Sequence, residues 1–246
     1  MAERFGRGRR GMEQAQVDVA LLAWVDRFRF VTFDRVAAFL GCSERRAAQR
    51  CRRLVRVGYL RMAAGGPAGR AVLYPTSRAT QMLGTLRRKP GLTVNAIAHE
   101  LAVIDTVLAV EADPDGWTVL TERECRRRQG LDVGRYSVPL PHAGSRGRER
   151  WPDLVLEHPD HEQRTAIEIE LSNKSQERLA QIAAGYLHGH YHAIWLAGTP
   201  TLERRIARTA DARSANSISS GRHRITVHPW TSDPAGLRSA LLRTAT

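Results

Sequence analysis

Two glutamates lie side by side in the segment "TAIEIELSNKS", residues 165–175. Ile167, Ile169 and Leu171 alternate with Glu168 and Glu170, which is the pattern of a β-strand. Because strand side chains alternate between the two faces of a sheet, both carboxylates are expected on one face. Such a pair needs either solvent or a cation opposite it. Both alternatives stay open at this point.

A second acidic motif precedes this segment. In "WPDLVLEH", Asp153 follows a proline at the start of another predicted strand. Together, Trp151–Leu156 and Ala166–Glu170 resemble the core of the PD-(D/E)XK nuclease superfamily, which has Pro-Asp on one strand and Glu-x-Lys on the next. The resemblance implies that Asp153 and Glu168 are catalytic ligands of Mg²⁺ or Mn²⁺, with Glu100 contributing from a preceding helix.

The motif departs from the superfamily at one position. Glu170 stands where the usual lysine would be and is expected to assist the metal or the nucleophile, with Lys174 as the candidate substitute cation. Two alternatives follow: the domain cleaves or nicks DNA with a divalent metal, or it keeps the fold without catalysis and without a cofactor. Arg178 and Tyr186, on the next predicted helix, are expected either to contact phosphate or to pack on the surface of that helix.

Another group of chemically active residues is the arginines of "TFDRVAAFLGCSERRAAQRCRRLVRVGYL", residues 32–60. The pattern predicts two helices around a tight turn, with Thr32 as N-cap of the first and Gly41 as its end. Ser43 is expected to cap the second helix. Helix, glycine-containing turn and helix is a helix-turn-helix arrangement.

The second of these helices is predicted to face DNA with one side and the core with the other. Ala47, Cys51, Leu54 and Val55 form the expected inward stripe. The segment "GYLRMAAGGPAGRAVLYPT" then predicts a hairpin, the wing of a winged helix. The residues expected to bind DNA are Arg45, Arg46, Gln49, Arg50, Arg52, Arg53, Arg56 and, near the tip of the wing, Arg70.

The charge of the chain is concentrated in its first third. Residues 1–90 contain 19 of the 38 basic residues but only 6 of the 25 acidic ones, an excess of 13 that equals the net charge of the whole chain. A localised positive field attracts polyanions, so double-stranded DNA is the expected partner. The composition, 42% hydrophobic and 26% charged, is typical of a globular protein.

The sequence gives no sign of a membrane protein or a secreted one. It has no apolar run of about 18 residues, and its basic N-terminus does not lead into the apolar stretch of a signal peptide. Cys42, Cys51 and Cys125 show no metal-binding spacing. We therefore expect a cytoplasmic, nucleoid-associated protein that does not bind membranes.

These segments predict a multi-domain α/β protein. A basic disordered tail (1–11) is expected to precede a winged helix-turn-helix domain (12–84), a linker (85–95) and a mixed α/β PD-(D/E)XK nuclease-like domain (96–246). The expected order in the last domain is one helix, three strands, then helix, strand, helix, strand and helix, with a loop around Pro139 and Pro141.

This layout, over about residues 13–200, also resembles the replication-relaxation family of actinobacterial plasmids and integrative elements. The resemblance implies a role in replication, mobilisation or transposition of a mobile element. The implied partners, besides DNA, are a second copy of the chain or other mobile-element proteins. The alternative is a non-catalytic winged-helix regulator or replication accessory factor whose C-terminal domain mediates protein contacts.

Overall fold

The computed structural model of the 246-residue chain divides into two compact units, Met1–Glu100 and Leu101–Thr246, called here the first and second units. The structure describes residues 2–66, 69–85, 93–112, 116–131, 135–140, 148–188, 191–214 and 224–245. The expected tail, 1–11, lies in a stretch whose side chains are outside the described residues, and so does 86–92 of the expected linker.

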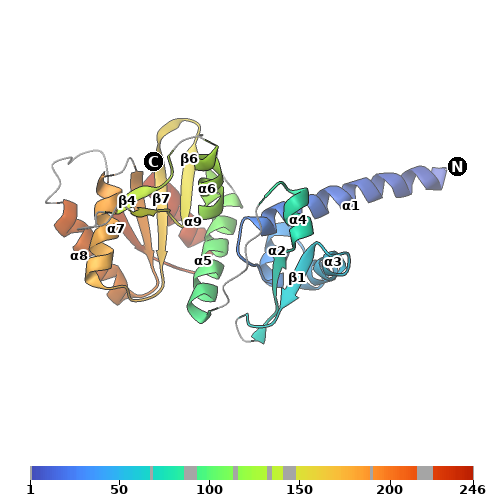
Figure 1. The fold of residues 1–246 in the computed structure, drawn as a ribbon, viewed down its shortest axis with the longest axis horizontal. Coiled ribbons are helices and arrows are strands. Elements are labelled where there is room, and N and C mark those ends of the chain that lie inside the picture. The colour runs from blue at the N-terminus through green and yellow to red at the C-terminus, as the bar shows by residue number, and fades with distance from the viewer. Residues whose placement is uncertain are drawn as a thin grey trace. The chain divides into compact units, whose positions relative to one another are not determined.

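The first unit is built from helices and one hairpin (Figure 1). Its elements are α1 (Ala2–Asp26), α2 (Phe33–Leu40), α3 (Glu44–Arg56), β1 (Leu60–Ala63), β2 (Val72–Pro75), α4 (Ser77–Met82) and the beginning of α5 (Val94–Glu111). The two helices and the hairpin expected from the sequence are α2, α3 and β1–β2.

The turn between α2 and α3 has the caps that the sequence predicts. Gly41 adopts a left-handed conformation with φ of 59°, which glycine tolerates without steric cost, and α2 ends there. The Ser43 side chain accepts a hydrogen bond from the backbone N–H of Arg46 at 3.4 Å, so α3 begins with a filled N-cap. Thr32 is the N-cap of α2 by position, but its side chain makes no cap hydrogen bond.

A short β-bridge joins the hairpin β1–β2 to the segment that precedes α2. Val31 and Leu73 exchange two backbone hydrogen bonds of 2.8 Å each. Both residues are fully buried, and β1 pairs with β2 in antiparallel register. The hairpin is thereby fixed to the same core as α2 and α3.

The core of the first unit follows the inward stripe predicted for α3 with one exception. Ala47, Cys51 and Leu54 of α3 are buried, whereas Val55 is only partly so. On α1, Val17 is exposed. The buried α1 residues are Leu21, Leu22, Trp24 and Val25.

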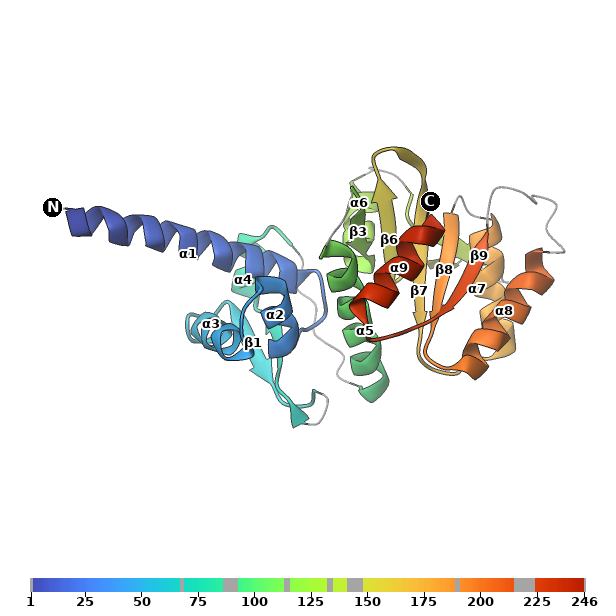
Figure 2. The same ribbon diagram turned by 180° about the vertical axis from the view of Figure 1, so that it is seen from behind.

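The second unit is a mixed α/β domain (Figures 1 and 2). After α5 it consists of β3 (Thr118–Thr121), α6 (Glu122–Gly130), β4 (Val138–Leu140), β5 (Arg148–Arg150), β6 (Leu154–His158), β7 (His161–Glu170), α7 (Gln176–His188), β8 (Tyr191–Ala197), α8 (Pro200–Ser214), β9 (Ile225–Pro229) and α9 (Pro234–Ala245).

Five of these strands form one sheet in the order β3-β6-β7-β8-β9. The pairs β3–β6 and β6–β7 are antiparallel, while β7–β8 and β8–β9 are parallel. Helices α7 and α8 pack with their apolar residues on one face of the sheet, and α9 lies on the opposite face (Figures 1 and 2). Within the described part of the chain, no helix is long and apolar enough to span a membrane.

Two elements of the second unit were missing from the sequence prediction. Helix α6 occupies the arginine-rich end of "GWTVLTERECRRR", which was expected to begin as a strand and was given no helix. It begins with a capping box, in which Glu124 Oε2 accepts from Thr121 N at 2.8 Å and Thr121 Oγ1 accepts from Glu124 N at 3.4 Å.

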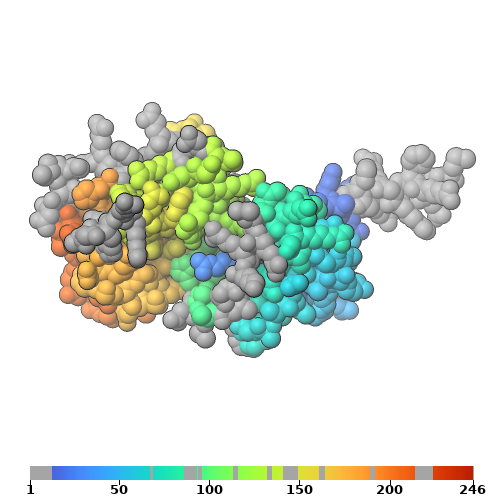
Figure 3. Space-filling view, in the orientation of Figure 1, coloured from blue at the N-terminus to red at the C-terminus, as the bar shows by residue number. Residues whose placement is uncertain are grey.

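The second missed element is the hairpin β4–β5, at both ends of a stretch expected to be a loop. Val138 pairs with Arg150 and Leu140 with Arg148, in a two-stranded sheet separate from the main one. Strand β4 packs against α7 so closely that a Cβ on Gly185 would lie 2.7 Å from Pro139 O. Figure 3 shows the yellow-green and yellow atoms of this part of the chain beside the orange atoms of α7.

Candidate functional site

The outer face of α3 is the most basic exposed helix face in the described part of the first unit. While Ala47, Cys51 and Leu54 anchor the helix, its other side is exposed to solvent. We call this side the outer face of α3. It consists of Arg45, Arg46, Gln49, Arg52 and Arg56.

Two of the α3 arginines that are expected to bind DNA form ion pairs with α1. Arg50 Nη1 lies 2.8 Å from Asp18 Oδ1, and Arg53 Nη2 forms an ion pair with Asp18 Oδ2. The Asp18 side chain is 14% exposed. Arg50 and Arg53 therefore neutralise an aspartate of their own unit, which distinguishes them from the outer face.

Arg70, the residue expected near the tip of the wing, is exposed in the segment that leads into β2. Its Nη1 lies 3.6 Å from Asp34 Oδ2, and Asp34 is in the first turn of α2. This distance is long for an ion pair, so the side chain can reorient at little cost. Its role in binding DNA stays a prediction.

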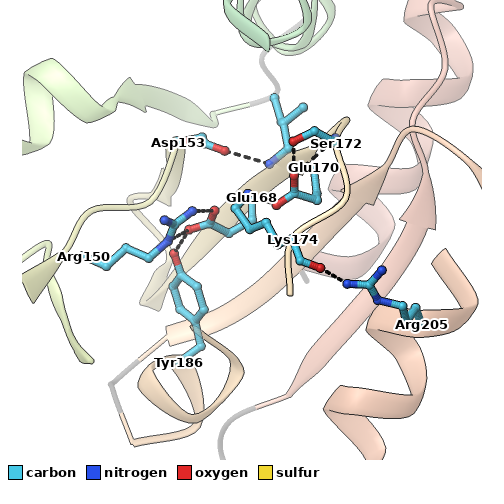
Figure 4. Close-up of polar contacts among 9 residues, drawn as sticks. Arg150, Asp153, Glu168, Glu170, Ser172, Lys174, Tyr186 and Arg205 are labelled. Carbon is cyan, nitrogen blue, oxygen red and sulfur yellow. Dashed lines mark hydrogen bonds and ion pairs between the residues drawn. The ribbon is translucent and has the colours of Figure 1, made fainter. Parts of the chain in front are cut away.

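Glu168 lies in the middle of the second unit, on the face of the sheet that α7 covers (Figure 4). It is 3% exposed, so the alternative of a solvated glutamate face is wrong. The Arg150 guanidinium holds the carboxylate with two hydrogen bonds, Nε to Oε1 at 3.0 Å and Nη2 to Oε2. The hydroxyl of Tyr186 donates a third bond to Oε1.

The electrostatics of this pair reflect its burial. Desolvation raises the pKa of Glu168, while Arg150 acts in the opposite direction. Burial alone would lower the pKa of Arg150, but the charge and hydrogen bonds of Glu168, together with the nearby Tyr186 and Asp153, outweigh burial and raise it. Two oppositely charged groups out of water stay ionised only when each compensates the other. Arg150 and Glu168 form such a compensated ion pair.

Asp153 immediately precedes β6 and lies near the same carboxylate. Since Leu154 pairs with Ile167 in the antiparallel ladder, Asp153 is opposite Glu168. Its Oδ2 accepts a hydrogen bond from the backbone N–H of Ile169 at 2.8 Å. The Asp153 carboxylate thus accepts the amide N–H of a β7 residue just before β6 begins at Leu154.

Glu170 and Lys174 form a second ion pair at the end of β7. Lys174 Nζ contacts Glu170 Oε2, and Ser172 donates to Oε1 from its backbone N at 3.3 Å and its hydroxyl at 3.2 Å. The side chain of Arg205 donates to the carbonyl of Lys174.

Glu170, like Glu168, is therefore buried beside a cation. It is 5% exposed, with Lys174 as its partner. Burial lowers the pKa of Lys174, and the nearby charge of Arg150 acts the same way. Glu168 and Asp153 oppose this effect, so Lys174 is also within electrostatic range of both.

Glu100, the remaining candidate catalytic residue, is the last residue of the first unit. Its Oε1 accepts a hydrogen bond from the backbone N–H of Arg29 at 2.7 Å, and its Oε2 lies 3.5 Å from Arg29 Nε. Glu100 is 7% exposed. It serves as an acceptor within its own unit, and the catalytic role implied by the resemblance stays a prediction.

The residues of the site, as they are arranged, do not fit a divalent cation. Both oxygens of Glu168 are bonded to Arg150, and Asp153 Oδ2 is bonded to a backbone amide. Across the described residues, no group of three or more His, Cys, Asp or Glu side chains is placed to hold a metal. Mg²⁺ needs oxygen ligands in near-octahedral geometry, which a carboxylate already occupied by a guanidinium cannot supply.

The sequence reasoning missed Arg150 and left the role of Tyr186 open. Arg150 is the last residue of β5, three positions before Asp153 in the sequence. No local pattern distinguishes it from the chain's other arginines. Tyr186 is 1% exposed and packs with Leu179, Ile182 and Ala183 of α7. Their helical spacing predicts an inward-facing stripe, so this signal was present in the sequence.

Comparison with known proteins bears on the second unit. The family model of the competence protein CoiA, nuclease-like domain, matches residues 146–228. This range contains Arg150, Asp153, Glu168, Lys174 and Tyr186. The chain is therefore similar to a nuclease-like domain in the part that holds the carboxylates.

The other comparisons give less. No curated protein matches the chain. Among solved structures, it is similar to protein VC1899 from Vibrio cholerae, with 12% sequence identity and a TM-score of 0.37. The alignment covers 84% of this chain and 44% of that one, so this chain spans less than half the length of that protein. The winged-helix and replication-relaxation assignments stay predictions.

Proposed function

We propose that the protein binds double-stranded DNA through α3 and the hairpin β1–β2, as a winged helix-turn-helix protein. The observation that carries this proposal is the outer face of α3. Four of its five side chains, those of Arg45, Arg46, Arg52 and Arg56, are exposed cations on a helix that its other side anchors. Guanidinium groups in such an array neutralise backbone phosphates, and an anchored helix fits the major groove.

We further propose that the nuclease-like domain serves the DNA of a plasmid or another mobile element during replication, mobilisation or transposition. In the arrangement described, Arg150 neutralises Glu168, which supports an accessory or regulatory role without cleavage. The domain would then contact a second copy of the chain or other mobile-element proteins.

A second candidate function is metal-dependent cleavage or nicking of DNA. The observation in its favour is that Asp153, Glu168 and Lys174 lie within electrostatic range of one another in a region similar to a nuclease-like domain. Glu170 contacts Lys174 at the same end of β7. This candidate requires Glu168 to leave Arg150.

The DNA-binding proposal is tested by the salt dependence of binding. A triple variant, Arg45→Ala, Arg46→Ala and Arg52→Ala, is compared with wild type by fluorescence anisotropy of a labelled duplex over a range of salt concentrations. The slope of log K against log salt should fall by about three, because each phosphate contact contributes about 0.9. An unchanged slope would rule out the outer face of α3 as the main contact.

The control removes the same number of exposed arginines from the second unit, at Arg204, Arg208 and Arg213 of α8. It has the same net charge as the test variant, so a general effect of net charge would lower binding in both. The proposal requires that the α8 variant keep most of the wild-type slope.

Cleavage is tested by incubating wild-type protein with supercoiled plasmid and Mg²⁺ or Mn²⁺. The accessory role predicts that DNA is bound but stays supercoiled. Nicked or linear product that is lost in both Asp153→Asn and Glu168→Gln would instead establish the second candidate.

A further inference from the structure

Arg150 reaches Glu168 from an element that is not part of the five-stranded sheet. It is the last residue of β5, whose only strand partner in the described residues is β4. Strand β4 packs on α7 at Gly185, and α7 also carries Tyr186. The main sheet supplies Glu168, whereas the hairpin β4–β5 supplies its counter-ion.

The guanidinium of Arg150 occupies the space around the carboxylates. It bonds both oxygens of Glu168 and is also attracted by the charge of Asp153. The side chain of Arg150 is 18% exposed, so the hairpin brings it in from near the surface. A cation bound to Glu168 would have to displace this group or lie beside it.

We propose that Arg150 is an internal counter-ion in the place of a divalent cation, and that moving its guanidinium away turns Asp153 and Glu168 into a divalent-cation site. This inference rests on the similarity to a nuclease-like domain that also underlies the proposed function. Strand β5 then positions the group that excludes the metal. With Arg150 on Glu168, the domain binds no metal at Asp153 and Glu168.

The physical reason is competition for one buried carboxylate. A positive charge about 4 Å from a dication repels it strongly inside a protein, so Arg150 and a metal cannot share Glu168. Without Arg150, the buried charge of Glu168 is uncompensated, and either a proton or a hard cation bound between Glu168 and Asp153 restores neutrality. Tyr186 remains as a hydrogen-bond donor that orients the carboxylate.

The test is Mn²⁺ binding to the full-length protein without DNA, measured from the loss of the free Mn²⁺ signal in electron paramagnetic resonance. Arg150→Met removes the charge and keeps most of the side-chain volume. We expect this variant to bind one Mn²⁺ at least about tenfold more tightly than wild type, because the repelling charge is gone. Adding Asp153→Asn, which can still accept the Ile169 amide, should remove most of that gain.

Arg128→Met is the matched control. Arg128 Nη1 also pairs with a glutamate of β6, Glu157, at 2.6 Å, but Glu157 keeps Arg164 as a second partner. This variant loses one arginine of the same unit without uncovering the Asp153–Glu168 pair, so its affinity for Mn²⁺ should equal that of wild type.

Two results would overturn the proposal: wild type binding Mn²⁺ as tightly as Arg150→Met, or a folded Arg150→Met that binds none. If Arg150→Met does not fold, Arg150→Gln also removes the charge but keeps an amide that can donate a hydrogen bond to Glu168. Its affinity for Mn²⁺ should then exceed that of wild type by a smaller factor, and equal affinity would overturn the proposal. Because no DNA is present, these outcomes are independent of the DNA-binding test.

Discussion

The protein uses arginine in two contrasting ways. On the outer face of α3, the arginines are exposed, so their charge acts on the surroundings. In the second unit, Arg150 pairs with the buried Glu168, which neutralises its charge inside the domain. Residue type alone does not distinguish these uses; the position of the nearest carboxylate does.

The net charge follows the same division. The excess of 13 positive charges lies entirely in residues 1–90, while the rest of the chain has equal numbers of basic and acidic residues. A second glutamate of this unit is also neutralised by arginine: Glu157 contacts Arg128, Arg164 and Tyr136. A glutamate, an arginine and a tyrosine thus recur together at two places in one domain.

The largest expected effect comes from breaking the buried pair. Arg150→Met should lower the free energy of unfolding by about 3–5 kcal/mol, because it leaves Glu168 charged, buried and without a cation. Adding Glu168→Gln should recover most of the loss, since both charges are then gone. Urea unfolding followed by tryptophan fluorescence measures both effects, because Trp195 pairs with Glu168 in the β7–β8 ladder.

The control for this prediction is an exposed ion pair in the same unit. Arg126 pairs with Glu122 along α6, and both side chains are substantially exposed. Arg126→Met should change the free energy of unfolding by less than about 0.5 kcal/mol. Equal losses in Arg126→Met and Arg150→Met would contradict the contrast between buried and exposed arginines.

An intermediate effect is expected where the hairpin β4–β5 meets α7. Gly185→Ala should destabilise the second unit by about 1–3 kcal/mol, because the new Cβ would lie 2.7 Å from Pro139 O. In an open helix position the same change usually stabilises, by up to about 1 kcal/mol. Thermal or urea unfolding gives the sign directly.

Gly130, at the end of α6, is the control for Gly185, because a Cβ there meets no atom within 4 Å. Gly130→Ala should be neutral or slightly stabilising. A stabilising Gly185→Ala would mean that the hairpin is not held against α7 as closely as described, which would also weaken the assignment of Arg150 to a fixed position.

The smallest expected effect concerns the two arginines of α3 that face α1. Arg50→Gln or Arg53→Gln should each lower the stability of the first unit by about 1 kcal/mol, because Asp18 loses one of its two cations. The salt dependence of DNA binding should stay close to that of wild type. A fall in slope as large as that caused by Arg45→Ala would place these residues in the DNA contact instead.

Local features of the sequence predicted much of the fold correctly. The turn at Gly41 and Ser43 is confirmed, because caps depend on residues close in sequence. The expected strands in "WPDLVLEH", "TAIEIELS" and "YHAIWLAGT" are β6, β7 and β8. Helix α6 was missed although Thr121 and Glu124 form a capping box, since a run of charged residues hid the signal.

The partners of the carboxylates could not be read from the sequence. Glu168 alternates with aliphatic residues, which predicts its face but not whether a helix covers that face. Its cation comes from Arg150, 18 residues away, through a hairpin whose short strands have no clear pattern. Pairing over such a distance depends on how the hairpin β4–β5 packs on α7, and that is decided by tertiary structure.

The bridge between Val31 and Leu73 has a consequence for motion in the first unit. Each residue donates its amide to the other, and because both bonds join the same pair of residues, separating the two segments exposes both amides to exchange with water. The hairpin β1–β2 and the segment before α2 therefore form one opening unit. Amide exchange at these two positions should slow down or speed up together, and it would report directly on how rigidly the hairpin is presented.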